Sequence, residues 1–187
     1  MILSPEQQKA YEAYRAGKNI FVTGPGGTGK SELIRAIVNH AKQHGKAIQV
    51  CATTGCAADL LQCGARTIHS WAGIGLAGGT VQEEVNKVAS RKQKQSNWKK
   101  TNILVIDEVS MMSAKLLHIL DLIARRVKTP LFPFGGIQLL LFGDFYQLPP
   151  VGDRDDPESV QYAFEYGRWT ELIKETIVLK TTFRQSD

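Results

Sequence analysis

The side chains best suited to chemistry lie in one glycine-rich run, Gly-Pro-Gly-Gly-Thr-Gly-Lys-Ser, which starts at Gly24. The run fits the pattern G-x-x-x-x-G-K-[ST] in full, with an apolar stretch before it and an amphipathic one after it. In this pattern, backbone N–H groups converge on phosphates at the positive end of a helix, the lysine reaches the β- and γ-phosphates, and the hydroxyl ligates Mg²⁺. The alternative, a glycine-rich turn with a chance lysine, leaves the flanking strand and helix patterns unexplained. We therefore predict a nucleoside-triphosphate site formed by Gly24, Gly26, Gly27, Thr28, Gly29, Lys30 and Ser31.

Two carboxylates, Asp107 and Glu108, follow a second apolar stretch. Open α/β sheets bind ligands at the carboxyl ends of their strands, which is where this pair is expected to lie. We expect Asp107 to hold Mg²⁺ together with Ser31, and Glu108 to orient and deprotonate the attacking water. Acidic residues also suit the start of a helix, but the presence of the glycine-rich loop favours the catalytic interpretation.

A sheet must bring these residues together, and the alternation of strand-like and helical stretches predicts one. Strands are expected at 19–23, 47–52, 103–106, 137–142 and 177–180, and helices at 30–44, 56–62 and 116–127. Such alternation is typical of a parallel sheet covered by helices. A length of 187 residues fits one domain. The predicted fold class is therefore α/β, a P-loop NTPase with a parallel sheet flanked by helices in a single domain.

Other stretches carry weaker patterns. Residues 67–79 are small, glycine-rich and aromatic, and are expected to form a shaped loop. The chain from Val81 is expected to be partly helical and otherwise mobile up to residue 100. In the helix at 116–127, the apolar stripe predicts an outer face that holds Lys115, Asp121, Arg125 and Arg126.

The composition, 43% hydrophobic and 22% charged, is that of a globular protein and excludes collagen-like and disordered classes. No apolar run is long enough to span a bilayer, and the first residues lack the layout of a secretory signal. Three cysteines, an odd number, fit a reduced protein. We therefore expect an intracellular protein without a membrane partner. His40 and His44 precede Cys51 and raise the possibility of zinc, but Cys51 lies in a strand-like run, so free thiols are expected.

The net charge of +5 comes from one stretch. Between Lys87 and Lys100 there are six basic residues and no acidic ones, which leaves 17 basic and 18 acidic residues elsewhere. Such a stripe is a candidate contact for a polyanion. Charge runs are more often solvated faces, so both interpretations stay open.

Nearly the whole chain resembles the superfamily 1 DNA helicases of the petite-integration-frequency type, the Pif-one helicases. Residues 3–7 resemble the Q motif, 143–151 resemble motif III, and 182–187 resemble motif IV, while 120–127 and 133–139 resemble the sequence that separates Pif-one from RecD and other superfamily 1 helicases. The resemblance implies that Gln7 reads adenine, which means ATP rather than GTP. It also implies that Gln147 senses the γ-phosphate and that Arg184 reaches it as a transition-state cation. Ser4 and Gln7 also fit a helix capping box, and both roles of Gln7 are compatible.

Two further segments are similar to motifs that line the single-strand track in this family: 52–58 to motif Ia and 67–75 to the motif Ib region. The resemblance implies that single-stranded DNA contacts Thr54, Gly55, His69, Ser70 and Trp71. Hydroxyls and amides can hold phosphates, and a ring can stack on a base for about 1–3 kcal/mol. A tryptophan among small residues is more often packed in a core, so for Trp71 both alternatives stay open.

The resemblance implies that residues 1–187 are a RecA-like ATP-binding helicase domain, the first of two motor halves. The second RecA-like half, with its arginine finger, is then absent from this sequence and is an expected partner. An arginine finger can contribute on the order of 10³ to 10⁵ to turnover, so weak hydrolysis is expected here. The predicted function is that of an ATP-dependent 5′ to 3′ DNA helicase motor, a monomer with ATP and Mg²⁺ as cofactors. The alternatives are a RecD-like or other DNA-dependent ATPase subunit, and a non-catalytic single-strand-binding module that ATP switches.

Overall fold

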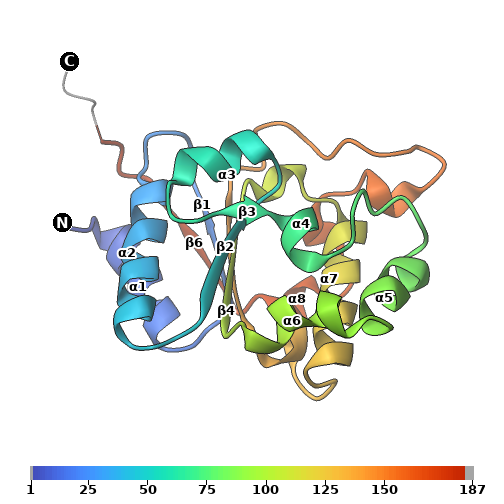
Figure 1. Cartoon of the computed structure of the whole chain (residues 1–187). Coiled ribbons are helices and arrows are strands. Elements are labelled where there is room, and N and C mark those ends of the chain that lie inside the picture. Colours follow the sequence, from blue (N-terminus) through green and yellow to red (C-terminus); the bar gives the residue numbers. More distant parts are fainter. Residues whose placement is uncertain (1, 184–187) are drawn as a thin grey trace.

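The computed structural model describes residues 2–183 and contains a six-stranded sheet in the order β3-β2-β4-β5-β1-β6 (Figure 1). All strand pairs are parallel. The strands are β1 (Ile20–Thr23), β2 (Ile48–Ala52), β3 (Arg66–Thr67), β4 (Ile103–Asp107), β5 (Gln138–Gly143) and β6 (Glu175–Val178). The predicted α/β class with a parallel sheet is confirmed, although β3 was not expected.

Helices cover both faces of the sheet (Figure 1). They are α1 (Pro5–Arg15), α2 (Lys30–Gln43), α3 (Gly55–Leu61), α4 (Ile68–Ala72), α5 (Val81–Ala89), α6 (Lys92–Lys100), α7 (Ala114–Val127) and α8 (Trp169–Leu172), with short 3₁₀ turns η1 (Val109–Met111), η2 (Pro133–Gly136), η3 (Pro157–Ser159) and η4 (Ala163–Glu165). The helices α1 and α2 pack on one face, whereas α4 to α8 lie on the other.

The central strands supply the core on both sides because successive side chains of a strand point to opposite faces. In β4, Ile103 and Val105 pack toward α1 and α2, whereas Leu104 and Ile106 pack toward α7. All four side chains are at most 1% exposed. A strand buried on both faces is typical of a parallel sheet, and this burial fixes the point at which β4 delivers Asp107 to the carboxyl edge.

Two predictions about the segment between β3 and β4 are wrong in part. Residues 67–79 are not all loop, because Thr67 caps α4 by accepting a hydrogen bond from the Ser70 amide. The stretch from 81 to 100 forms α5 and α6, so the helix expected from Val81 is confirmed and the mobile remainder is wrong. Buried Val85 and Val88 hold α5 in the core, and Trp98, which is fully buried, anchors α6. The sequence of α6 is otherwise polar, so its pattern did not predict that one tryptophan would anchor the helix in the core.

The predicted outer face of α7 is also wrong for three of its four residues. Asp121 is fully buried, and the side chains of Lys115 and Arg125 are only 11% and 12% exposed. Arg125 is paired with Asp121 (2.9 Å), and Lys115 is paired with Asp156. Only Arg126 is exposed as expected. The loops after α7 supply the missing partners, which explains how charged side chains are accommodated on this face.

Candidate functional site

The glycine-rich loop joins β1 to α2, as predicted, and its geometry depends on glycine. Gly29 has a φ of +82°, and a Cβ there would lie 2.3 Å from the Nε2 atom of Gln7. At Gly24 a Cβ would lie 2.7 Å from the carbonyl oxygen of Leu179. Thr28 is buried, and its hydroxyl donates to the Pro25 carbonyl (2.7 Å), so it stabilises the loop from within. The loop is thus held between α1 and the segment after β6.

Gln7 connects the start of α1 to this loop. Its side-chain oxygen accepts from the Ser4 amide (2.8 Å), and the Gln7 amide donates to the Ser4 hydroxyl (3.2 Å), which confirms the predicted capping box. Its Nε2 atom donates to the Gly29 carbonyl (3.0 Å). The side chain is therefore beside the phosphate loop, where contact with an adenine base remains a prediction.

Lys30 lies at the centre of the charged groups. Its Nζ atom donates to the carbonyls of Gly24 (2.5 Å) and Pro25 (3.0 Å). Partial burial lowers the pKa of Lys30, while the carboxylates of Asp107, Asp144 and Glu108 act in the opposite direction. These three carboxylates belong to the segments after β4 and β5, so the sheet brings them to the same edge as the loop after β1.

Asp107 is the last residue of β4 and is only 8% exposed. Burial raises the pKa of this carboxyl from 3.8 to about 6, and the charge of Glu108 adds to the effect, whereas Lys30 opposes it. A bound divalent cation would favour the charged form. The carboxylate of Asp107 and the hydroxyl of Ser31, which is exposed in the first turn of α2, are donors of the kind Mg²⁺ takes alongside phosphates and water. This donor set fits the predicted metal.

Glu108 adopts a left-handed backbone conformation (φ +59°) immediately after the strand. A positive φ is uncommon for a residue other than glycine and occurs at turns and functional sites. The carbonyl of Glu108 accepts from the Thr53 hydroxyl (3.3 Å), which ties this turn to the end of β2. Sequence reasoning did not assign Thr53, although it stands next to Thr54 in the same motif.

The loop after β5 contributes Asp144, which was not predicted as a site residue. The signal was present in the sequence, because Asp144 follows a buried strand just as Asp107 does. Gly143 lets η1 come close, since a Cβ there would lie 2.9 Å from the Val109 amide nitrogen. Gln147 lies farther along this loop with an exposed side chain, and its amide donates to the Asp144 carbonyl (3.0 Å). Its contact with a γ-phosphate therefore stays a prediction.

The chain returns to the phosphate loop after β6. The Phe183 amide donates to the Gly27 carbonyl (2.9 Å), a contact that no sequence pattern indicated. The predicted cation Arg184 lies outside the described residues. The last described residue, Phe183, is the one that contacts the phosphate loop.

The residues predicted to contact DNA lie after β2 and in α4. Thr54 caps α3 by accepting from the Ala57 amide (3.2 Å), and Gly55 is exposed beside it. In α4, Ser70 is exposed and its hydroxyl accepts from Arg66 (3.4 Å), while burial lowers the pKa of His69 and favours its neutral ring. These four residues follow β2 and β3, the strands on the far side of β4 from the phosphate loop.

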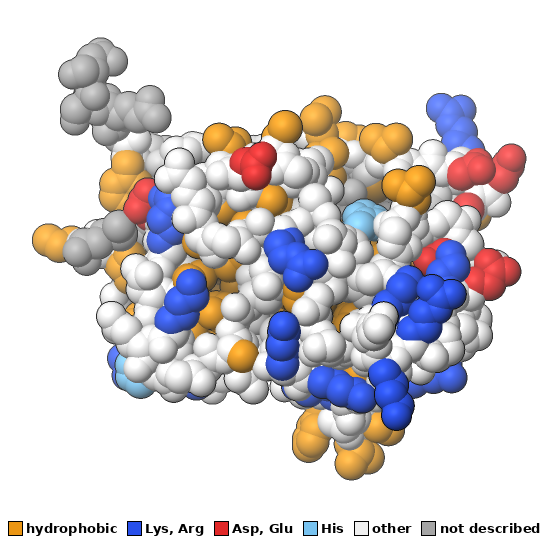
Figure 2. Space-filling view, in the orientation of Figure 1, with side chains coloured by type: hydrophobic (Ala, Val, Ile, Leu, Met, Phe, Trp, Pro, Cys, Tyr) orange, Lys and Arg blue, Asp and Glu red, His pale blue; other side chains and the backbone are white. Residues whose placement is uncertain are grey.

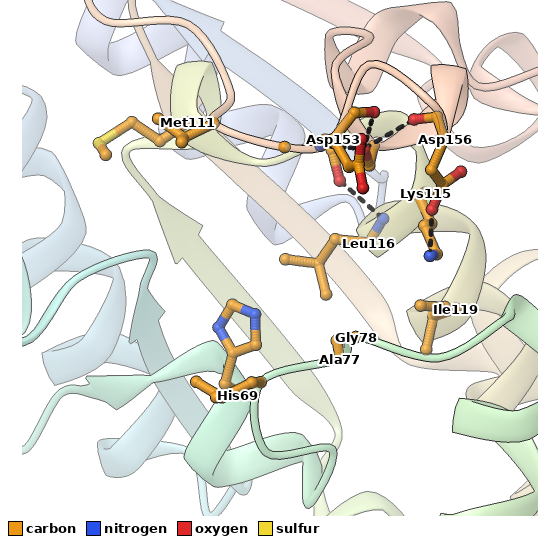
Figure 3. A pocket seen from close by; sticks show the side chains of 14 residues that line it. His69, Ala77, Gly78, Met111, Lys115, Leu116, Ile119, Asp153 and Asp156 are labelled. Carbon is orange, nitrogen blue, oxygen red and sulfur yellow. Dashed lines mark hydrogen bonds and ion pairs between the residues drawn. The ribbon is translucent and has the colours of Figure 1, made fainter.

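A cavity of about 400 Å³ opens beside His69 (Figure 3). His69 points into it from one side, with Met111 and Leu116 opposite, and the Lys115–Asp156 ion pair lies at its polar end. The lining combines α4, the segment after Asp107 and the loop after β5, including Val151 and Asp153. The cavity is therefore lined both by His69, a candidate DNA contact, and by the segments that follow Asp107 and Asp144.

Trp71 does not line this surface. Its side chain is 1% exposed and packs against Trp98, with ring centroids 4.5 Å apart. Asn97 donates to the Trp71 carbonyl (3.0 Å), so the residue fixes α4 on α6. Of the two alternatives for Trp71, the structure shows the packed core, and a ring in this position cannot stack on a base. Ile68 and Trp71, three residues apart, share the buried face of α4, whereas Ser70 is exposed and His69 is half-buried.

Within residues 2–183, no group of three or more His, Cys, Asp or Glu side chains could hold a metal ion. Cys51 is fully buried, and this burial raises the pKa of its thiol to about 12, which makes it a poor source of thiolate for zinc.

A parallel sheet with a phosphate loop after β1 and a carboxylate after β4 defines the class: this is a P-loop NTPase with a RecA-like fold. The family model of the PIF1-like helicases matches residues 2–187. The chain therefore belongs to the PIF1-like helicase family.

Named relatives agree with this assignment. The chain is 40% identical to the ATP-dependent DNA helicase RRM3 of Saccharomyces cerevisiae, over all of this chain and 26% of that protein. It is 42% identical to the ATP-dependent DNA helicase PIF1 of Candida albicans, over 99% of this chain and 21% of that protein. The crystal structure of Pif1 helicase from Candida albicans superposes with a TM-score of 0.87 at 42% identity, covering 99% of this chain and 41% of that one. Pif1 helicase from Bacteroides, crystallised in complex with ADP-AlF3 and ssDNA, gives a TM-score of 0.82 at 30% identity, covering 100% of this chain and 44% of that one.

The chain spans about a quarter or less of the length of these curated relatives. Among the described residues, no helix is both long and apolar enough to cross a membrane.

Proposed function

We propose that this chain is the ATP-binding motor module of an ATP-dependent DNA helicase, which binds ATP with Mg²⁺ and moves 5′ to 3′ along single-stranded DNA. The observation that carries the proposal is the position of Lys30, which donates to two carbonyls of the phosphate loop at the sheet edge where the chain also carries Asp107, Glu108 and Asp144. A cation between a loop of amides and a set of carboxylates suits a triphosphate and its metal. The relatives named above, which are DNA helicases, support the choice of reaction.

Each residue has a role in this proposal. The loop amides and Lys30 bind the β- and γ-phosphates, and Gln7 orients the adenine. Ser31 and Asp107 would hold Mg²⁺, which when bound neutralises phosphate charge. Glu108 takes the proton of the attacking water. Gln147 and Arg184 contact the γ-phosphate, an assignment that rests on the family resemblance alone.

The DNA track in this proposal runs over Thr54, Gly55, His69 and Ser70. Two connections would couple it to the nucleotide. The Thr53 hydroxyl donates to the backbone carbonyl of Glu108, so the segment after β2 is linked to the backbone turn that carries the proposed catalytic carboxylate. The wall of the His69 cavity includes Met111 and Val151, which follow Asp107 and Asp144 in the chain. A change at the γ-phosphate can therefore reach the strand through these two segments.

The experiment compares Lys30→Ala with Glu108→Gln in titrations of Mg·ATP and in hydrolysis with and without single-stranded DNA. We expect Lys30→Ala to abolish nucleotide binding, because phosphate charge is then left without its cation. We expect Glu108→Gln to keep binding and to lose turnover by about 10²- to 10⁴-fold, the usual contribution of a general base.

Lys42→Ala, in the last turn of the same helix, is the matched control and should bind as the unchanged chain does. Unchanged ATP affinity in Lys30→Ala would refute the site. If ATP binds but DNA never stimulates hydrolysis, also when a second RecA-like half is supplied, the ATP-switched binding module would be the better description.

A further inference from the structure

A groove of about 530 Å³ lies between the loop after α4 and the junction of α5 with α6. One wall is the loop itself, residues 74–79, and the other holds three basic side chains, Lys87, Arg91 and Lys94. We call this feature the basic groove. Figure 2 shows lysine and arginine side chains gathered on the face of the molecule where α5 and α6 lie.

The three cations of the basic groove differ in their contacts. Lys94 donates to the Gly73 carbonyl (2.9 Å), and Lys87 pairs with the buried carboxylate of Glu84 (2.8 Å). Arg91 is exposed and makes no ion pair within residues 2–183. The groove thus holds three positive charges, and two carboxylates lie near its end at Gly79: Glu84, which pairs with Lys87, and Glu83, which accepts from the Thr80 amide (2.9 Å). Residues 85–100 contain no acidic side chain.

The opposite wall is preformed and open. Glu84 also accepts from the Gly79 amide (2.9 Å), which fixes the end of the loop to α5. A Cβ built on Gly75 or on Gly78 would meet nothing within 4 Å, so a ligand can approach the loop backbone at both positions. Small residues facing a line of cations suit an extended phosphodiester backbone, which needs positive charge and close approach rather than a deep apolar pocket.

The basic groove adjoins the proposed DNA track. Leu76, Ala77 and Gly78 line the groove on one side and the His69 cavity on the other, so this loop is a shared wall. Gly73 caps α4 just after His69 and Ser70, and its carbonyl accepts the hydrogen bond from Lys94. A strand that leaves His69 across this loop enters the groove directly.

We propose that the basic groove is a second DNA contact, which binds phosphates of the strand that continues beyond His69; this inference rests on the proposed DNA-binding function. The contact carries no base specificity, because the groove offers cations and backbone rather than base-reading side chains. It lengthens the segment of DNA that this module holds.

The test measures DNA affinity of the chain at several salt concentrations with two single strands: a short one that fits the track alone and a longer one that extends past it. For the longer strand, Arg91→Gln with Lys94→Gln should lower the salt slope by about 1.4, since each single-strand phosphate contact contributes about 0.7. Affinity should fall roughly tenfold for the loss of two such contacts. The single variant Arg91→Gln, at an exposed side chain that anchors nothing, should give about half the change in slope.

Lys99→Gln with Lys100→Gln is the matched control, because it removes two charges from the same helix outside the groove. It should leave the slope unchanged. Equal salt slopes for the two double variants, or equal affinity of the chain for both strands, would overturn the groove as a DNA contact without contradicting the proposed track. Failure to bind either strand would overturn both. Arg91-dependent binding of an acidic polypeptide, with DNA affinity unaffected, would assign the groove to a protein and overturn the proposal.

Discussion

At Asp107, burial lowers the stability of the folded chain at neutral pH, although the proposed Mg²⁺ site needs this carboxylate in its charged form. The same burial that places its carboxylate beside Lys30 raises its pKa from 3.8 to about 6. The folded chain therefore binds more protons than the unfolded chain between these values, so the free energy of unfolding falls as the pH rises from 4 to 7. The difference corresponds to about 3 kcal/mol for the fully ionised carboxylate.

We predict that Asp107→Asn raises the melting temperature of the nucleotide-free chain at pH 7 and flattens this fall with pH. Thermal unfolding at pH 7 measures the melting temperature, and denaturant unfolding at a series of pH values measures the change of the unfolding free energy with pH. Asp59→Asn, at an exposed aspartate of α3, is the control and should keep the fall seen in the unchanged chain. A melting temperature at pH 7 that drops in Asp107→Asn would contradict the account of this residue.

The glycine-rich loop shows which residue roles a sequence can predict. Lys30, Ser31 and Asp107 belong to linear patterns whose spacing and flanking strands are visible in the chain, and each was predicted. Asp144 has the same signal after its strand and lies within residues 143–151, which resemble motif III, yet Gln147 alone of that motif was assigned a role. The contact of Phe183 with Gly27 joins residues from distant parts of the chain, and no local pattern contains it.

At the level of elements, Asp121 holds together three segments that are separate in the sequence. Its carboxylate accepts from Arg125 (2.9 Å), from the Tyr166 hydroxyl (2.7 Å) and from the Phe134 amide (3.1 Å). The helix α7, the turn η2 and the segment after η4 are therefore linked by one buried side chain. Burial and the hydrogen bond to Asp121 both raise the pKa of Tyr166, which keeps its hydroxyl a donor.

We predict that Asp121→Ala lowers the free energy of unfolding by about 3–5 kcal/mol, because it breaks a buried ion pair and leaves Arg125 with Glu171 as its remaining carboxylate. It also leaves the Tyr166 hydroxyl and the Phe134 amide without their acceptor. Chemical denaturation measures the change. Arg126→Ala is the matched control one turn away, and since Arg126 is exposed, it should cost less than about 0.5 kcal/mol. Similar costs for the two variants would show that this network does not stabilise the fold.

This network explains why helix patterns gave the correct elements but the wrong face for some residues. The apolar stripe of α7 was visible in the sequence, and the helix lies where it predicts. Whether Asp121 is buried depends on Phe134 and Tyr166, which approach only when the chain folds back. Trp71 is a similar case, because its burial depends on Trp98 in a helix whose own sequence is almost entirely polar.

At the level of the whole molecule, the same sheet positions the proposed nucleotide site and the proposed DNA track. The carboxyl ends of β1, β4 and β5 meet at the nucleotide site, and the ends of β2 and β3 lead to the residues proposed for DNA. The hydrogen bond from the Thr53 hydroxyl to the Glu108 carbonyl (3.3 Å) links these two parts of the edge. The basic groove extends the same edge toward α5 and α6.

The most direct test of the central claim is a crystal structure of the chain with a non-hydrolysable ATP analogue and Mn²⁺ in place of Mg²⁺. The account predicts the triphosphate against the amides of residues 24–30, the Lys30 ammonium moved from the loop carbonyls onto the phosphates, and an anomalous manganese peak between the Ser31 hydroxyl and the Asp107 carboxylate. A nucleotide bound elsewhere, or a metal peak remote from Asp107, would contradict it.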